Sequence, residues 1–457
     1  MDSFMSAAAV QRLERYFQQI GEVLGEESRR GSFALYAMGL LGDGERKSVE
    51  PIAARACPDP ERVDAMHQRL LHFAVDSRWS DRDVRRQAAR YALEAMTRRE
   101  SVEAWIVDDT GFLKQGKHSV GVQRQYTGSA GKVANCQIGV SLSVTTRTEH
   151  LPVDFELYLP ECWANDEARR REARIPAEVS FRTKPQLALR MIERAVEDGV
   201  APGVLLADSA YGNSSDFRAR LRALGLHYAV AVSAQTTVRL LDAKGRPRKD
   251  SQSVSDLVWR LHERGGFRRC TWRQGTQEAL SARFALRRVV AAGVHQREQE
   301  PLGLLIEWRD SEPEPANYFL ISLPEGRTKK QLIRLVMQRW RTERVYEDLK
   351  GELGLDHYEG RRFPGWHHHV SVALCCYAFL VAERTRRFPP RPEGRLKPTR
   401  SHSRPERHFR DSFITARLAM ARVIANWLPR CPTCHRTNHH HRTSRRLPGL
   451  PVHPSGP

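Results

Sequence analysis

The stretch Trp105–Tyr126, WIVDDTGFLKQGKHSVGVQRQY, joins an apolar run to two adjacent carboxylates and then to a basic loop. The three residues from Trp105 onward are large and apolar, which is typical of a strand buried on both faces of a sheet. Asp108 and Asp109 follow at once, and such an ending either caps a turn or holds a cation. Side chains alternate along a strand, so we expect these two carboxylates on opposite faces of the sheet.

A second apolar run, GVLLADSAYG at 203–212, also ends in an acid, Asp208. Around it the pattern predicts further strands at 136–146, 151–160 and 227–234, and helices at 183–199 and 214–225. The order of three strands, helix, strand, helix and strand indicates an α/β fold. Both acid-terminated strands end where an open α/β sheet places its chemistry.

The charge balance favours a polyanionic partner. The chain of 457 residues carries 74 Lys and Arg against 54 Asp and Glu, a net charge of +20. Such an excess favours DNA or RNA, and an anionic membrane surface is the weaker alternative. The segment from Arg384 to Pro457 alone holds 17 basic and 3 acidic residues. It reads as a solvated tail, a nucleic-acid contact, or both.

The cysteines and the apolar runs indicate the cellular compartment in which the protein is expected. Of the eight cysteines, four are scattered singly and Cys375 and Cys376 lie in an apolar run, which is typical of a reducing compartment. The N-terminal residues lack the charged and apolar regions of a secretory signal. The longest apolar run, Val370–Ala382, is too short to cross a bilayer. We therefore expect a cytoplasmic protein with no membrane partner.

Two further regions flank the α/β pattern. Residues 6–100 show helical periodicity, and 47–73 read as helix, short Pro-containing turn and helix. That segment is either an ordinary helical hairpin or a helix-turn-helix with one helix in a DNA groove. Residues 235–325 contain extra strands with turn-rich connections, which predicts a β-rich insertion. Its tryptophans, Trp259, Trp272 and Trp308, either fill a core or stack on an extruded base.

A strong helix is expected at 328–352, and it carries charged residues at helical spacing. Arg339, Glu343, Glu347 and Lys350 are separated by four, four and three positions, which places them on one helical face. Surface ion pairing explains such a pattern by itself. With two acids already at strand ends, however, a third carboxylate would complete a site for two Mg²⁺ ions, which favour oxygen ligands and catalyse phosphoryl transfer.

Strand-Asp, strand-Asp and helix-Glu, with a β insertion before the helix, resembles the RNase H-like catalytic domain of bacterial insertion-sequence DDE transposases. The cut-and-paste group of that family has Tyr, two residues, Arg, three residues, Glu, six residues and Lys around its glutamate. Arg339, Glu343 and Lys350 match that spacing, and Val336 stands in place of the tyrosine. The resemblance covers about residues 10–385.

The resemblance implies an RNase H-like core with a β-rich insertion, preceded by an all-helical N-terminal domain. The expected divisions are a helical DNA-binding domain at 1–100, core at 101–234, insertion at 235–326, core helices at 327–388 and a basic tail at 389–457. Because the family's aspartate immediately precedes a threonine, it implies Asp109 rather than Asp108. Glu343 is preferred over Glu347 because only Glu343 has Arg and Lys at the family spacing.

We therefore expect a transposase that binds terminal inverted repeats and both cleaves and transfers DNA strands. The expected metal ligands and catalytic residues are Asp109, Asp208 and Glu343, with Mg²⁺ as cofactor and Mn²⁺ as a substitute. Expected DNA contacts are Arg339, Lys350, Lys114, Lys117 and Arg124, with His118 beside them. The resemblance also implies a hairpin intermediate and a homodimer in the synaptic complex, with transposon ends and target DNA as partners.

Two rivals share much of this pattern. A stand-alone RNase H-like nuclease would use the same carboxylates without strand transfer. A transposase-derived DNA-binding regulator would retain them only as structure. Two segments that contain histidines have alternative interpretations. CPTCHRTNHHHR at 431–442 is either a basic tail or a crowded zinc site. His367–His369 are expected at a helix start near DNA rather than at a metal.

Overall fold

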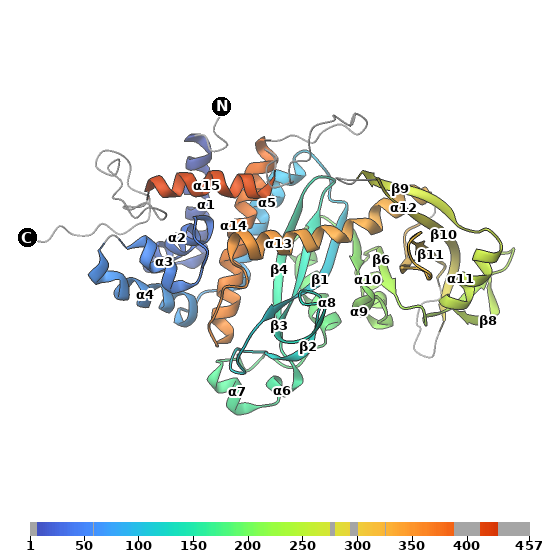
Figure 1. Ribbon diagram of the computed structural model, residues 1–457, viewed down its shortest axis with the longest axis horizontal. Coiled ribbons are helices and arrows are strands. Elements are labelled where there is room, and N and C mark those ends of the chain that lie inside the picture. The colour runs from blue at the N-terminus through green and yellow to red at the C-terminus, as the bar shows by residue number, and fades with distance from the viewer. Residues whose placement is uncertain are drawn as a thin grey trace, which may run out of the picture.

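The structure, a computed structural model, describes residues 7–57, 59–274, 279–292, 300–324, 326–387 and 412–427. The N-terminal segment is helical, as expected (Figure 1). Its elements are α1 (Ala7–Leu24), α2 (Glu27–Leu41), α3 (Val49–Ala56), the 3-10 turn η1 (Pro60–Arg62), α4 (Val63–Leu71), the π-helical turn η2 (His72–Asp76) and α5 (Asp81–Thr97).

One mixed sheet of 12 strands forms the centre of the molecule. Its core strands are β1 (Ala104–Leu113), β2 (Gln123–Thr127), β3 (Lys132–Thr145), β4 (His150–Tyr158), β5 (Val204–Ala207) and β6 (Tyr228–Val232). The helices between them are α6 (Glu161–Ala164), α7 (Glu167–Glu172), α8 (Lys184–Glu197), α9 (Ser209–Gly212) and α10 (Ser215–Ala223). This arrangement confirms the mixed α/β class and is consistent with an RNase H-like core.

Strand β1 lies between β3 and β5. It runs antiparallel to β3 and parallel to β5, with Ala104 opposite Val204. Its residues from Ala104 to Val107 are fully buried, because helices cover both faces of the sheet there. Strand β1 does not end at its acids but continues to Leu113, so Asp108 and Asp109 lie within the strand, just beyond Ile106, its last partner on β5, while Asp208 follows the carboxyl end of β5.

The predicted insertion extends this sheet. It contains β7 (Thr237–Leu241), β8 (Pro247–Ser253), α11 (Val254–Glu263), β9 (Arg268–Gln274), β10 (Ala279–Ala292), β11 (Leu302–Trp308) and β12 (Asn317–Ile321). Strand β12 pairs antiparallel with β6, so the insertion continues the core sheet edge to edge. In Figure 1 these strands occupy the end of the long axis opposite the N-terminal helices.

The expected helix at 328–352 is interrupted. It consists of α12 (Lys329–Val336), a 3-10 turn η3 (Met337–Trp340) and α13 (Arg341–Leu353). A 3-10 turn is more tightly wound than an α-helix, so the interruption changes the direction in which the flanking side chains point. Within η3, Gln338 and Arg339 bond to Glu103 and Asp108 of the sheet region, which accounts for the local winding.

Two further helices complete the described chain, α14 (Phe363–Arg387) and α15 (Phe413–Trp427). Helix α14 is buried along most of its length and packs against α5, β4 and α2. The N-terminal helices thus share one hydrophobic core with α14 and the sheet. Within the described residues, every helix is too short or too polar to cross a membrane.

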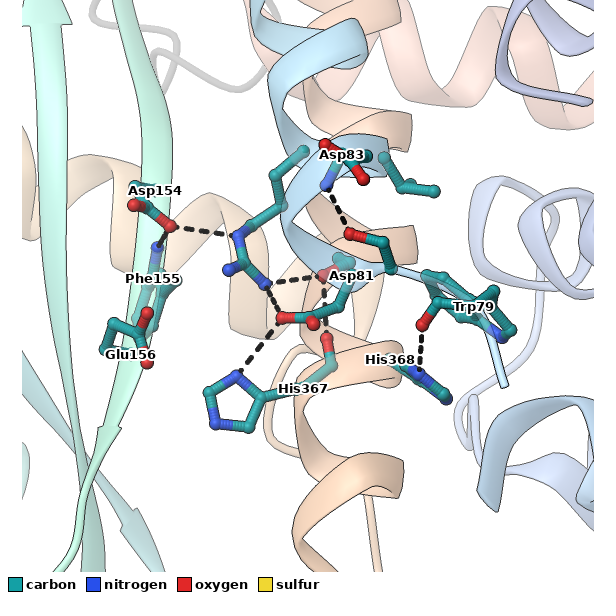
Figure 2. Close-up of polar contacts among 12 residues, drawn as sticks. Trp79, Asp81, Asp83, Asp154, Phe155, Glu156, His367 and His368 are labelled. Carbon is teal, nitrogen blue, oxygen red and sulfur yellow. Dashed lines mark hydrogen bonds and ion pairs between the residues drawn. The ribbon is translucent and has the colours of Figure 1, made fainter. Parts of the chain in front are cut away.

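A buried ionic network ties α5, β4 and α14 together (Figure 2), and α8 joins it through Arg194. The Arg85 guanidinium, 3% exposed, bonds to Asp154 of β4 at 3.0 Å, to Asp81 at 2.5 Å and to the Ser371 hydroxyl at 2.9 Å. Arg194 of α8 reaches the second oxygen of Asp154 at 2.6 Å. Buried charges of this kind need such complete pairing, because each isolated ion is costly to desolvate.

Candidate active site

Strand β1 sends its two acids to opposite faces of the sheet, as alternation predicts. Asp108 lies on the face covered by η3 and α13, where Arg339 donates to its Oδ2 at 2.6 Å. Asp109 lies on the face covered by α8 and α9. The Asp109 main-chain N–H donates to Asp108 Oδ1 at 2.8 Å, which fixes the first carboxylate against the strand.

Asp208 is delivered by the end of β5. It is the N-cap of the short helix α9, and its Oδ1 accepts from the Ala210 N–H at 2.9 Å. Gly212 ends that helix, and a Cβ there would lie 1.9 Å from the Ala231 carbonyl oxygen. Only glycine permits this close approach of α9 to β6, so the motif that follows the aspartate positions it through backbone packing.

Glu343 stands in the first turn of α13 and is exposed. Val345, Tyr346 and Leu349 of α13 are buried. The Tyr346 hydroxyl also bonds to Ser141 of β3 at 2.6 Å. Because Tyr346 lies three residues from Glu343, this contact fixes α13 against the sheet within one helical turn of Glu343.

Arg339 is the centre of the cluster on this face. Its pKa is raised by the carboxylates of Asp108, Asp208 and Glu343 against the lowering effect of burial, which is the largest single influence. One guanidinium therefore interacts with three acids that come from β1, from the end of β5 and from α13. The structure places Arg339 in contact with Asp108 rather than Asp109, and the charges of Asp208 and Glu343 also act on Arg339.

Asp109 forms an ion pair with a different basic residue, Lys184. The Lys184 ammonium, at the start of α8, lies 3.0 Å from Asp109 Oδ2. The buried Tyr211 hydroxyl of α9 donates to the same oxygen at 3.2 Å. Tyr211 also interacts with Asp108 and Asp208, because its ring lies between the ends of β1 and β5.

Burial and mutual repulsion raise the pKa values of two of the acids, Asp108 and Asp208. Burial raises the pKa of Asp108 to about 7; Arg339 opposes this, and the nearby carboxylates of Asp208 and Asp109 reinforce it. Burial also raises the pKa of Asp208, with Arg339 again opposing and Asp109 reinforcing. A concentration of negative charge that has to be balanced by cations is typical of a functional site.

The basic residues expected to contact DNA divide into two groups. Lys350 donates to Thr110 Oγ1, the Gly111 carbonyl and Ser129 Oγ at 2.8, 2.7 and 3.1 Å. Lys114 donates to the Tyr358 carbonyl at 2.6 Å. Like Arg339, these two side chains point inward. Exposed at the surface are Lys117, His118 and Arg124.

The donor set fits a divalent cation. Carboxylate oxygens are the ligands that Mg²⁺ prefers. Among the described residues, no three potential ligands already stand together as a metal cluster. Arg339 and Lys184 instead supply positive charge beside the acids. Each of the two acids of β1 is thus paired with one basic side chain.

Lys184 and Tyr211 were not among the residues expected at the site. Lys184 lies 75 positions from Asp109 in the sequence, so no local pattern connects them. Tyr211 is only three residues beyond Asp208, and its place in the same short motif is the one signal that could have pointed to it.

Other expectations meet different outcomes. His367–His369 lie near the start of α14, as expected, and all three are buried. His368 bonds to the Ala74 carbonyl and His369 to the Tyr36 hydroxyl, so they join α14 to the N-terminal helices. The segment 431–442 lies outside the described residues.

In the insertion, the tryptophans occupy different environments. Trp308 is buried and meets Trp259 edge to face, with ring centroids 5.5 Å apart. Trp259 is 45% exposed. Trp272 packs edge to face on Phe284. Packing thus explains Trp308, and Trp259 retains a surface that can meet a ligand.

Comparisons with known proteins identify families and a relative that this chain resembles. The family model described as DDE superfamily endonuclease matches residues 16–279, and the model described as transposase DDE domain matches residues 181–379. The probable transposase for insertion sequence element IS701 from Microchaete diplosiphon is 28% identical over 260 residues. The match spans 57% of this chain and 61% of that protein, so it covers less than two thirds of the relative.

Proposed function

The chain belongs to the DDE superfamily endonuclease family, and from this premise we propose that it is an insertion-sequence transposase that cleaves and transfers DNA strands with a divalent metal. The observation that carries the proposal is the meeting of acids from three separate elements at one edge of the sheet. These are Asp108 of β1, Asp208 after β5 and Glu343 of α13, whose charges all act on Arg339.

We assign the metal ligands as Asp109, Asp208 and Glu343, following the match of Asp109 to the family motif. Asp108 would then hold Arg339, with which it forms the 2.6 Å ion pair. Lys350 would support the second half of β1 through its bonds to Thr110 and Gly111. Arg339 and Lys350 lie close enough to the acids to contact a phosphate that enters the site.

Mg²⁺, or Mn²⁺ in its place, would activate the attacking oxygen and neutralise charge on the scissile phosphate. Water first attacks the phosphodiester at the element's end and leaves a 3′-OH. That 3′-OH then attacks the opposite strand or the target DNA. The carboxylates hold the reacting groups in position, since phosphoryl transfer depends mainly on positioning and electrostatic stabilisation.

DNA recognition needs a larger surface than this edge. We propose that the N-terminal helices and the insertion bind the terminal inverted repeats, with a homodimer in the synaptic complex. Helix α4 buries only Leu70 and exposes Asp64, Ala65 and Gln68, so its outer face is open to a groove. The exposed residues Lys117, in the loop after β1, and Arg124, in β2, would follow the phosphate backbone.

The test is cleavage of DNA that carries the end of the encoding element and its flank, with Mg²⁺ or with EDTA. Asp208→Asn is the decisive variant. Asp216→Asn is its matched control, since Asp216 is an exposed acid in the first turn of α10, eight residues along the chain. We expect a metal-dependent cut at the element boundary by the wild type and by Asp216→Asn, and none by Asp208→Asn.

Other outcomes would contradict the proposal in distinguishable ways. Cutting without regard to the element's end indicates a stand-alone nuclease. Specific binding without cutting by the wild type indicates a DNA-binding regulator. Equal cutting by wild type and Asp208→Asn removes Asp208 from the site.

A further inference from the structure

We propose that Lys184 is a built-in counterion of Asp109, which DNA draws away from this carboxylate so that divalent cations bind tightly only to the DNA-bound protein. The inference rests on the proposed function and adds to it an order of binding, DNA before metal. It also assigns a role to a residue outside the Asp, Asp and Glu set.

The Lys184 ammonium occupies the position beside Asp109 that a metal ion bound to this carboxylate would need. It lies 3.0 Å from Asp109 Oδ2, and the Tyr211 hydroxyl approaches the same oxygen at 3.2 Å. A carboxylate oxygen that already accepts from an ammonium and a hydroxyl is a poor ligand for a second cation. A divalent cation at that oxygen would also be repelled by the ammonium at this short distance.

Helix α8 fixes the backbone of Lys184 and leaves its side chain free to turn. Lys184 is the first residue of α8, after the N-cap Thr183, whose hydroxyl and the Gln186 side chain form a capping box. Leu187, Met191 and Ile192 bury the helix in the core. The Lys184 side chain is 27% exposed and that of Asp109 is 18% exposed. The ammonium can therefore leave by side-chain rotation alone, without movement of the helix.

Phosphate is the natural competitor for that ammonium. Lysine binds phosphate as a point charge, and a DNA backbone at the cleavage edge presents phosphates to the side chains around Asp109. If DNA takes Lys184 from Asp109, the carboxylate gains capacity for a divalent cation. By linkage, the factor by which DNA tightens metal binding equals the factor by which metal tightens DNA binding.

The experiment measures Mn²⁺ binding to the full chain by electron paramagnetic resonance, which detects free Mn²⁺, without DNA and with a short duplex that lacks the element's end. Lys184→Gln is the test variant. Lys329→Gln is the matched control, because Lys329 is the first residue of α12 behind Thr328 and an equivalent capping box, and it points to the Phe284 carbonyl. Asp109→Asn, alone and combined with Lys184→Gln, locates any effect at that carboxylate.

We expect Lys184→Gln to tighten DNA-free Mn²⁺ binding about 5-fold or more, the lower end of ordinary coupling between sites. Lys329→Gln should bind as the wild type does. The duplex should tighten Mn²⁺ binding to the wild type and have a smaller effect on Lys184→Gln. In the Asp109→Asn background, removal of Lys184 should give no gain.

The inference is overturned if folded Lys184→Gln binds Mn²⁺ no tighter than the wild type, or if the gain persists without Asp109. Should Lys184→Gln fail to fold, Lys184→Met, which keeps most of the aliphatic stem, is measured instead. Because binding and cutting are separate readouts, the two proposals fail separately. If the wild type cuts element ends but Lys184→Gln has an unchanged Mn²⁺ affinity, the transposase proposal holds and the proposed counterion role of Lys184 fails.

Discussion

The Arg339 guanidinium donates to the Asp108 carboxylate at 2.6 Å, across 231 positions of sequence. This contact joins the turn between α12 and α13 to the end of the central strand. It brings one basic side chain into the field of Asp208 and Glu343 as well. Asp109, the next residue along, turns away to Lys184. The two neighbouring acids of β1 therefore have different partners and, in our account, different roles.

Separate substitutions of these acids should have unequal effects. Asp109→Asn should lower the single-turnover rate of end cleavage about 100-fold or more, because loss of a metal ligand removes several kcal/mol of transition-state stabilisation. Asp108→Asn should cost less, because it only loosens the hold on Arg339. A gel assay of cleaved strands under metal excess gives both rates. Reversal of the order would make Asp108 the ligand.

The ionic network around Arg85 should be essential to stability. Arg85→Met leaves the buried Asp81 and Asp154 carboxylates without a shared cation, and loss of one partner of a buried pair typically costs about 3–5 kcal/mol. Arg98→Met is the control, because Arg98 and Glu94 form an exposed pair that contributes about 1 kcal/mol or less. Urea unfolding measures both. Equal small losses would show that the network does not stabilise the fold.

Lys47 should make stability rise with pH. It is 3% exposed, and its ammonium donates to the carbonyls of Leu40, Gly42 and Glu352. Burial lowers its pKa to about 7, with Arg417 and Arg55 acting in the same direction and Cys376 and Glu352 opposing.

Between pH 7 and the unfolded pKa of about 10.4, the unfolded chain holds a proton that the folded chain has released, so stability rises with pH. From pH 7 to pH 9 this adds roughly 2 kcal/mol to the free energy of unfolding. Urea titrations at both pH values should show the rise in the wild type and in a Lys330→Met control, which alters an exposed lysine. Lys47→Met should lack it. An equal rise in Lys47→Met would assign the pH dependence to other groups.

The loop after β1 should contribute to DNA binding through its outer lysine. Lys117→Ala should reduce the slope of log affinity against log salt by about 0.9, the value for one phosphate contact. Lys114→Ala should leave that slope unchanged, because Lys114 already donates to the Tyr358 carbonyl. Fluorescence anisotropy over a salt series distinguishes them. A loss of slope in Lys114→Ala alone would show that the inward lysine turns out to meet DNA.

Local sequence patterns predicted the secondary-structure elements that carry the acids of this site, because hydrophobic periodicity reflects local structure. The apolar runs before Asp108 and Asp208 identified both strands, whose parallel pairing joins residues about 100 positions apart. The spacing of Arg339 and Glu343 identified the right segment, although that segment proved to be interrupted by η3. The interruption depends on contacts with Glu103 and Asp108 on the sheet side, which helical periodicity does not contain.

Long-range packing determined what the sequence pattern missed. Lys184 meets Asp109 only because α8 packs on the sheet. His367–His369 look like surface polar residues in sequence, but α14 is enclosed by the N-terminal helices and the histidines pair with groups there. The insertion continues the core sheet because β12 returns beside β6, a pairing between residues about 90 positions apart.

The most direct test of the three-carboxylate site compares two glutamates one helical turn apart on α13. Glu343→Gln and Glu347→Gln each remove one exposed acid from the same helix. Single-turnover cleavage of element-end DNA with Mg²⁺ is then measured for both. Our account predicts no cut above background for Glu343→Gln and a rate within about 2-fold of the wild type for Glu347→Gln, in line with the small effect of most surface substitutions. Wild-type cutting by Glu343→Gln would contradict it.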